Sequence, residues 1–498
     1  MIEGIATGLA TAFTLQNIAF LLSGCFAGTF IGMLPGLGPM TAIALMIPIA
    51  SALEPSSGII MMAAVYYGAI FGGSTSSILI NAPGVASTVA TSFDGYPMAK
   101  QGKAGKALAV AAIASFAGGI IAAILLLLLA PYLATLSLSF QSTDYFALII
   151  LGLASVAAFA GSSGMLKAIT MTVFGLMLST VGSDQTQGLP RFTLGQIDLI
   201  DGISFLLLVM ATFALSEALL SIMRQDEAGP SPSEKLTDIA ISADEAIETA
   251  PAVVRSSTLG FLVGLLPGAG ATIASFLAYA TEQRFAPARL AKAFGHGSVR
   301  GLAAPEAANN AAATGSFVPL LTLGIPGSGT TAILLGALIA YGIQPGPLLY
   351  INNPEVFWGV IVSMWLGNIV LLLLNLPLIP YIARILTVRK SILLPIILFF
   401  SLIGVYLVSF NSFDLQLMVI FAAVAVFFRL LDFPMAPMIL GFILGGMIEE
   451  NLSRALLIYD GTWVFLWERP LTAAILLLVV SVLILPFLLQ LIVSRRNT

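Results

Sequence analysis

The residues best suited to chemistry in this chain are glycines and prolines that interrupt apolar segments. One such motif, motif 1, runs from Gly28 to Gly38 and recurs 232 positions later as Gly260–Gly270. Glycine and proline weaken or end helices, so the backbone hydrogen bonds of the apolar segment must be lost there. In hydrocarbon, such a break is tolerated only where the freed groups face protein or a water-filled cavity. Paired interruptions in matching halves of a chain are typical of the binding site of a secondary transporter.

A second motif, motif 2, follows motif 1 in each half of the chain. Ile80–Thr88 aligns with Leu323–Thr331, 243 positions later, and both copies contain a Pro-Gly pair. Because two motifs repeat in the same order at nearly the same spacing, we infer that the chain contains a duplication.

The interruptions predict an anion site that needs no basic side chain. A break exposes unpaired N–H groups and partial positive charge at the start of the next half-helix, and such a terminus binds anions. Carbonyls freed by the same break are hard oxygen ligands suited to Na⁺. The alternative is that the small residues only allow close helix packing.

The predicted substrate contacts are the residues of the two motifs and one nearby amide: Pro35, Gly36, Gly38, Asn81, Pro83, Gly84, Ser87, Thr88, Pro267, Gly268, Gly270, Asn310, Pro326, Gly327, Ser328, Thr330 and Thr331. The predicted ligands of a coupling ion, Na⁺ or H⁺, are Gly36, Gly268 and Thr330.

Composition determines which elements must carry these motifs. The chain is 58% hydrophobic and 9% charged, against about 25% charged in soluble domains. Apolar runs such as Ala107–Leu133 and Leu471–Val493 exceed the ~20 residues that a spanning helix needs. We therefore predict an all-α polytopic membrane protein. Its single cysteine, Cys25, excludes a disulfide framework and is interpreted as a small packing residue.

Basic residues predict the orientation of the two halves. Lys100, Lys103 and Lys106 follow motif 2 in the first half, whereas the matching segment Tyr341–Glu355 contains no Lys or Arg. The asymmetry is reversed after motif 1, where only the second half carries basic residues, among them Arg284. Because Lys and Arg collect in cytoplasmic loops, corresponding loops are expected on opposite faces, as in inverted repeats. The predicted organisation is a first membrane repeat over 1–222, a polar cytoplasmic linker over 223–255 and a second membrane repeat over 256–498.

This orientation constrains the shape of both motifs. Arg255 and Arg284 flank the second motif 1, and Leu259–Tyr279 is too short for two crossings, so a re-entrant hairpin is expected. Motif 2 must lie on a segment that crosses, and is interpreted as a broken transmembrane helix. Four such elements could meet near the midplane and move together in an elevator-like manner, by analogy.

Isolated titratable residues suggest no catalytic centre. The chain has one histidine, His296, interpreted as a surface residue, and it lacks metalloprotease and nucleotide-binding motifs. Glu306 is interpreted as a carboxylate in the first turn of a helix, with proton or cation handling as the alternative. Lys167 is expected to anchor a short connection and Asp94 to cap a turn. We therefore expect no enzyme activity, no resident metal and no cofactor.

The combined motifs resemble those of the large membrane subunit of the tripartite tricarboxylate transporters, the TctA-like family. The resemblance covers nearly the whole chain and rests on Gly32–Pro39, Tyr67–Thr75, Asp94–Pro97, Pro305–Asn310 and Gly324–Ser328. Family members often carry an acid after the first Asn-x-Pro-Gly, where this chain has Val85.

The resemblance implies a multi-pass protein of the bacterial inner membrane, in contact with lipid and without a nucleic-acid partner. It implies an importer of tricarboxylates or related organic carboxylates, driven by an ion gradient. Its partners would be a small four-helix membrane subunit (TctB-like) and a periplasmic solute-binding protein (TctC-like). The alternatives are a channel, which would conduct ions without saturable uptake, and a lipid-modifying membrane enzyme, which would need a polar catalytic cluster.

Overall fold

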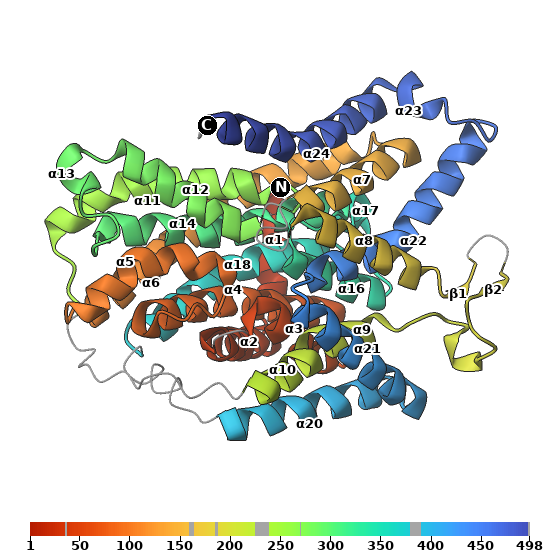
Figure 1. The fold of residues 1–498 in the computed structure, drawn as a ribbon, viewed down its shortest axis with the longest axis horizontal. Coiled ribbons are helices and arrows are strands. Elements are labelled where there is room, and N and C mark those ends of the chain that lie inside the picture. The colour runs from red at the N-terminus through yellow and green to blue at the C-terminus, as the bar shows by residue number, and fades with distance from the viewer. Residues whose placement is uncertain are drawn as a thin grey trace.

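The structure of the chain is a computed structural model that describes residues 1–34, 37–158, 164–184, 188–224, 239–268, 270–378 and 390–496. Most of these residues lie in helices, as the apolar runs predict (Figure 1). The strands among them are the short antiparallel pair β1 (Gly182–Ser183) and β2 (Pro190–Arg191).

The helices of the first half are α1 (Ile2–Ala12), α2 (Leu15–Met33), α3 (Gly38–Ala50), α4 (Pro55–Ile80), the 3₁₀ turn η1 (Ala86–Thr88), α5 (Val89–Lys100), α6 (Ala104–Ser137), α7 (Ser142–Ala158), α8 (Met165–Ser179), the 3₁₀ turn η3 (Ile197–Leu199), α9 (Phe205–Val209), the π-helical segment η4 (Met210–Leu215) and α10 (Ser216–Arg224). Those of the second half are α11 (Ala243–Gly264), α12 (Gly270–Phe285), α13 (Ala288–Ala291), α14 (Val299–Gly315), α15 (Phe317–Leu323), α16 (Gly329–Ala340), α17 (Pro347–Asn352), α18 (Pro354–Asn375), α20 (Lys390–Ser409), α21 (Ser412–Leu430), α22 (Met435–Ile458), α23 (Phe465–Glu468) and α24 (Pro470–Arg496).

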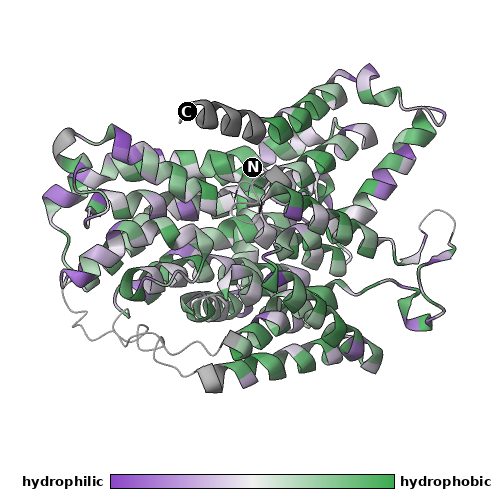
Figure 2. Ribbon diagram, viewed as in Figure 1, coloured by the Kyte–Doolittle hydropathy of each residue, from purple (hydrophilic) through white to green (hydrophobic). Residues whose placement is uncertain are grey.

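The described helices have the length and composition of membrane spans. Seven of them are long and apolar enough to cross a bilayer: α2, α4, α6, the continuous α9–α10 segment, α18, α21 and α22. Apolar residues dominate the helices in Figure 2, and large apolar side chains such as Phe399 and Leu407 are exposed on α20. Exposed apolar surface on this scale is stable in lipid rather than in water. The prediction of an all-α polytopic membrane protein is confirmed apart from the minor β1–β2 pair.

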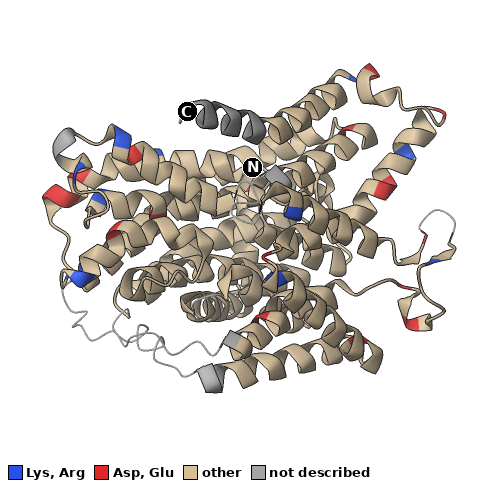
Figure 3. Ribbon diagram, viewed as in Figure 1, with Lys and Arg blue, Asp and Glu red and all other residues tan. Residues whose placement is uncertain are grey.

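Charged residues gather towards two ends of the molecule. In Figure 3 one group surrounds α5, α11 and α13, and the other surrounds β2, α22 and α23. Few charges lie among the helices between them, which suits a structure with two polar faces and an apolar middle.

Close packing between α2 and α4 depends on glycines of motif 1. A Cβ atom built at Gly28 would collide with the backbone carbonyl of Val65, and one at Gly32 would collide with that of Ala69. Without side chains at these positions, the two helices approach backbone to backbone. The glycine spacing of motif 1 therefore fixes how its helix packs.

The same contact recurs between α11 and α14. A Cβ atom at Gly260 would collide with the carbonyl of Ala308, and one at Gly264 with that of Ala312. Gly260 and Gly264 lie 232 positions after their first-half counterparts, and Ala308 and Ala312 lie 243 positions after theirs. The glycines of motif 1 pack against the helix before motif 2 in both halves.

Motif 2 ends a helix in both halves. Helix α4 ends at Ile80 and is followed by Asn81 with φ 52°, while α15 ends at Leu323 and is followed by Gly324 with φ 70°. A left-handed residue directly after a helix is a common terminator, and asparagine and glycine adopt it most readily. The helical run resumes after each Pro-Gly pair, at η1 and α5 in the first half and at α16 in the second.

The described part of the predicted linker is largely helical. Ser242 and Glu245 form a reciprocal cap that starts α11 at Ala243, and this helix continues to Gly264. Residues 243–255 therefore belong to the same helix as the beginning of the second motif 1.

Candidate functional site

The second copy of motif 1 turns the chain back on itself. Helix α11 ends at Gly264, α12 begins at Gly270, and the two helices pack side by side. Gly268 has φ 81° and donates its N–H to the carbonyl of Gly327 at 3.0 Å, which ties this turn to motif 2. The first copy places Gly38, with φ 49°, at the start of α3, whereas Pro35 and Gly36 lie outside the described residues.

An ion cluster closes the open end of this α11–α12 hairpin. Arg255 of α11 and Arg300 of α14 bind the buried carboxylate of Glu282 on α12 at 2.8 and 2.6 Å. Burial alone would raise the pKa of Glu282, but the two guanidinium groups outweigh it and hold that pKa below its usual value. The ends of α11 and α12 that lie away from the turn are therefore joined by the same charged cluster.

The second copy of motif 2 presents a capped helix N-terminus. Ser328 Oγ accepts from the N–H of Thr331 at 3.2 Å, and Thr331 Oγ1 accepts from the N–H of Ser328 at 2.8 Å. The hydroxyl of Tyr66 on α4 lies near those of Ser316, Ser328 and Thr330. Hydroxyl groups from both halves of the chain therefore meet at the start of α16.

The first copy of motif 2 turns its hydroxyls inward. Thr88 Oγ1 lies 2.9 Å from the carbonyl of Val85 and accepts from Ser77 Oγ at 2.7 Å. Val85 occupies the position that corresponds to Ser328, and no side chain caps η1 or α5. Ser87 Oγ is buried and has no partner among the described residues.

The structure brings the described parts of all four motif copies into contact. Gly84 packs against Gly32 within the first half, as Gly327 packs near Gly264 in the second. Across the halves, η1 packs against α12, and α16 packs against α3.

The remaining predicted contacts lie at the turns of the motifs, apart from Asn310, which lies within a helix. Pro267 and Pro326 flank the Gly268–Gly327 hydrogen bond, and Asn81 and Pro83 form the exposed end of α4 and the turn after it. Asn310 is buried within α14 and donates to the carbonyl of Glu306 at 3.1 Å.

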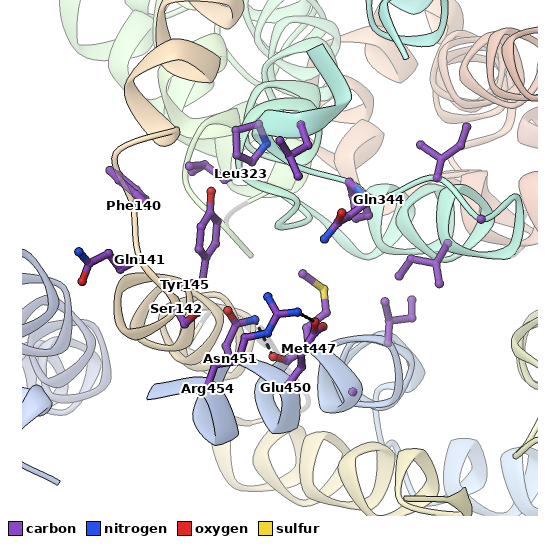
Figure 4. Close-up of a pocket in the computed structure, with 18 of the residues that line it drawn as sticks. Phe140, Gln141, Ser142, Tyr145, Leu323, Gln344, Met447, Glu450, Asn451 and Arg454 are labelled. Carbon is purple, nitrogen blue, oxygen red and sulfur yellow. Dashed lines mark hydrogen bonds and ion pairs between the residues drawn. The ribbon is translucent and has the colours of Figure 1, made fainter. Parts of the chain in front are cut away.

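A cavity of about 840 Å³ lies beside these junctions and was missed by the sequence reasoning. It is lined by the segment between α6 and α7, the loop after α16, and one face of α22 (Figure 4). Its polar residues include Gln141, Gln344 and Arg454, and Arg454 pairs with Glu450 at 2.6 Å. None of the predicted substrate contacts lines it, although Leu323, directly before the second break, does. Apart from Leu323, these residues belong to neither repeated motif, so the sequence offered no signal for the cavity.

The interpretation of Glu306 as a first-turn carboxylate is wrong. Helix α14 begins at Val299, so Glu306 lies beyond its first two turns, in a buried segment. Its carboxylate accepts hydrogen bonds from Ser74 of α4, Thr91 of α5 and Ser115 of α6.

Asp94 is a residue whose partner could not be read from the sequence. It lies inside α5 and accepts from the N–H groups of Gly297 and Ser298 at 2.9 and 2.7 Å, and from Tyr279. It therefore caps the turn that precedes α14, in the other half of the chain.

His296 and Cys25 lie where the sequence reasoning placed them, whereas Lys167 lies in a helix and not in a connection. His296 is exposed and Cys25 is buried. Lys167, in the first turn of α8, donates to the carbonyl of Leu431 at 2.7 Å and lies over the ring of Phe433. No group of three potential metal ligands occurs within the described ranges.

These features define a multi-pass helical membrane protein whose helices are interrupted at matching points in two halves, an arrangement typical of secondary transporters. The chain belongs to the tripartite tricarboxylate transporter TctA family, whose model matches residues 18–440. The resemblance inferred from the motifs is confirmed, and this is a family of transporter subunits rather than of enzymes.

Two curated relatives come from Agrobacterium vitis. The chain is 41% identical over 477 residues to an uncharacterized 52.8 kDa protein in the TAR-I ttuC' 3'region, covering 96% of this chain and 94% of the relative. It is 42% identical over 219 residues to an uncharacterized protein in the TAR-II ttuC' 3'region, covering 44% of this chain and 89% of the relative. No solved structure matches the chain.

Proposed function

We propose that this chain is the membrane subunit of an ion-gradient-driven importer of a tricarboxylate or related organic carboxylate, which a separate binding protein delivers. The observation that carries the proposal is the family match over residues 18–440. The importer would lie in a bacterial inner membrane with a small four-helix subunit and a periplasmic solute-binding protein as its partners.

The start of α16 supports carboxylate binding. Its twelve residues are apolar except for Thr330 and Thr331, so the helix itself contributes no basic group. The dipole at its N-terminus, together with the hydroxyls of Ser328, Thr330 and Tyr66, offers hydrogen-bond donors to an anion. The hydrogen bond from Gly268 to Gly327 joins the second copy of motif 1 to this terminus.

Charge balance supports coupling to a cation. A helix N-terminus carries only about half an elementary charge, so a di- or tricarboxylate needs more neutralisation than the motifs supply. Co-transport of Na⁺ or H⁺ would supply it, with Gly36, Gly268 and Thr330 as the proposed ligands. Ion and substrate affinities must then be reciprocally linked.

Contacts between the loops support inverted repeats, re-entrant hairpins and an elevator-like moving unit. Gln101, after motif 2 of the first half, donates to the carbonyl of His296, after motif 1 of the second, at 2.9 Å. Conversely, Tyr341, after motif 2 of the second half, donates to the carbonyl of Ala50, after motif 1 of the first. Loops from different motifs meet in this way when one repeat is upside down relative to the other.

The 840 Å³ cavity suits a substrate entry in this orientation. It is lined by Gln344 and other residues of the loop after α16, which would face the periplasm. Gln141 and Arg454 add polar donors to its wall. A binding protein docked over this side could release a carboxylate into the cavity.

The proposal is tested by uptake into proteoliposomes that contain this chain, its small subunit and its binding protein. Imposed Na⁺ or pH gradients should drive accumulation of a tricarboxylate, and collapsing both gradients should stop it. Liposomes lacking the binding protein are the control. Accumulation that ignores both gradients would contradict ion-coupled transport.

The orientation is tested by labelling single cysteines in the Cys25→Ser background. Cysteines near Ser56, such as one at the exposed Glu54, and near Gln344 should react from the periplasm, and cysteines near Gly102 and Ala286 from the cytoplasm. Reaction of Gly102→Cys and Gln344→Cys from the same face would contradict inverted repeats.

A further inference from the structure

Glu306 is a fully buried acid surrounded by hydroxyl groups from three other helices. Ser74 Oγ lies 2.8 Å from both carboxylate oxygens, Ser115 Oγ lies 2.8 Å from Oε2, and Thr91 donates to Oε1. In the part of the chain that the structure describes, Glu306 forms no ion pair. Its hydrogen-bond partners are therefore neutral.

A carboxyl group in such a place is either protonated or, when ionised, held by a positive partner. Transfer of an ionised group into an apolar interior is very unfavourable unless it is paired or coordinates a metal ion. Hydroxyl donors reduce this penalty but bring no positive charge. The same hydroxyls retain oxygen lone pairs that a cation can share with the carboxylate.

A small cavity lies directly beside this cluster. Its volume is about 10 Å³, close to the minimum that accommodates one water-sized particle. Its polar lining residues are Ser74, Thr75, Ser115 and Asn375, and its apolar lining residues are Phe71, Leu108, Ala111 and Ala112. Ser74 and Ser115 also donate hydrogen bonds to Glu306, so the same two hydroxyl groups contact the cavity and the carboxylate.

Asn375 gives independent evidence for a ligand in this cavity. The residue is 4% exposed, and its Nδ2 donates to the carbonyl of Leu371 at 3.0 Å. Its Oδ1 is buried and has no partner among the described residues. Asn375 is also the last residue of α18, and a helix C-terminus carries partial negative charge. An unpaired acceptor at a negative helix end calls for a donor or a cation.

We propose that Ser74, Ser115 and Asn375 bind one Na⁺ ion in this cavity, with the carboxylate of Glu306 directly behind the two hydroxyls. The proposed ligands are all oxygen atoms, the donors that hard cations prefer, and Glu306 supplies a single negative charge. Ca²⁺ takes six to eight oxygens and usually several carboxylates, which this site lacks. Thr91, bonded to the other carboxylate oxygen, is a positioning residue that orients Glu306.

The location of the site gives the ion a mechanical role. Ser74, Thr91 and Glu306 belong to the helices around motif 2, whereas Ser115 and Asn375 belong to the uninterrupted spans α6 and α18. An ion bound here would hold the two sets of helices together. The role rests on the proposed ion-coupled transport, but Na⁺ binding itself does not.

The test is equilibrium binding of radioactive sodium to the purified full-length chain in lipid nanodiscs, without carboxylate or partner subunits. The wild type should bind Na⁺ saturably, with K⁺ competing poorly. Glu306→Gln keeps the shape and removes the charge, and should weaken binding by at least about 10-fold. Ser115→Ala and Asn375→Leu, which each remove one ligand, should weaken it less, and Thr91→Val should shift affinity without changing the number of ions bound.

The matched control is Glu355→Gln, an exposed acid in the first turn of α18, which should bind Na⁺ like the wild type. If Glu306→Gln does not fold, Na⁺ binding by the Ser115→Ala and Asn375→Leu variants tests the site instead. Unchanged binding in both would overturn the proposal. Absence of Na⁺ binding in the wild type, with a protonation step that disappears in Glu306→Gln, would also overturn it in favour of a proton site. Transport without this site would leave the proposed function intact.

Discussion

Asn81 and Gly324 end their helices in the same left-handed conformation, but the residues that follow them differ. After Gly324, Ser328 and Thr331 cap α16 reciprocally and face Tyr66. After Asn81, a valine stands at the capping position and no side chain caps α5. The two helix breaks therefore share a backbone conformation but differ in the polar side chains that surround them.

The places where loops of the two halves meet differ in the same way. At one of them, where Gln101 bonds to the carbonyl of His296, the second half adds a charged cluster of its own, in which Arg255 and Arg300 hold Glu282. The other meeting is neutral, with the hydroxyl of Tyr341 bonded to the carbonyl of Ala50. Positions related by the repeat therefore have unequal chemistry. The two halves therefore share the backbone contacts between closely packed helices. They differ in the side chains at the helix breaks and at the loops.

The largest effect is expected where the halves agree. Gly32→Ala and Gly264→Ala each drive a methyl group into the backbone of a neighbouring helix, so each should lower the free energy of unfolding by about 3 kcal/mol. Thermal unfolding of the purified protein measures both. Gly367→Ala is the control, because its added Cβ would meet Tyr67 at 3.8 Å, an ordinary contact. A large loss in one half with tolerance in the other would contradict the shared packing.

A smaller effect is expected where loops meet. Glu282→Gln leaves Arg300, whose side chain is 10% exposed, without its charge partner and should lower the free energy of unfolding by about 2 kcal/mol. Tyr341→Phe removes one neutral hydrogen bond and should lower it by about 1 kcal/mol. Equal losses in thermal unfolding would erase the contrast between the charged and neutral ends.

The charged end should also be sensitive to acid. The folded pKa of Glu282 lies below its usual value, so its contribution is complete above about pH 4.5 and is lost as pH falls through the folded pKa. The Glu282→Gln variant should lack this part of the acid sensitivity. A wild type and variant that lose stability in parallel as the pH falls from about 5 to about 3, through the ordinary pKa and below it, would contradict the assignment.

The architecture could be predicted from the sequence because it follows from local rules. Glycine and proline spacing predicted the interrupted helices, and apolar runs predicted the polytopic fold. The partners of Glu306 could not be predicted, because Ser74, Thr91 and Ser115 come from three separate helices with no shared spacing. The first-turn interpretation failed because Pro305, normally a helix starter, lies inside α14.

The glycines of motif 2 show a second limit. Gly84 and Gly327 were predicted to admit substrate, yet a Cβ at either position would meet backbone of the same half. Substitution there would disturb packing whether or not substrate approaches. Residues with a polar group to lose test the site more directly.

The smallest and most specific effect is expected at the caps. Ser328→Ala removes the acceptor for the N–H of Thr331 and should lower the free energy of unfolding by about 1 kcal/mol. Ser328→Thr keeps an acceptor and should restore most of this loss. Val85→Ser at the matching position should change stability by less than about 0.5 kcal/mol, since that turn already forms without a side-chain cap.

If the capped terminus also binds carboxylate, Ser328→Ala should lower uptake more than Val85→Ser does, and Ser328→Thr should recover it. Thermal unfolding and proteoliposome uptake measure the two consequences separately. Equal responses at Ser328 and Val85 in both measurements would show that the two breaks are chemically equivalent, contrary to the difference in their caps.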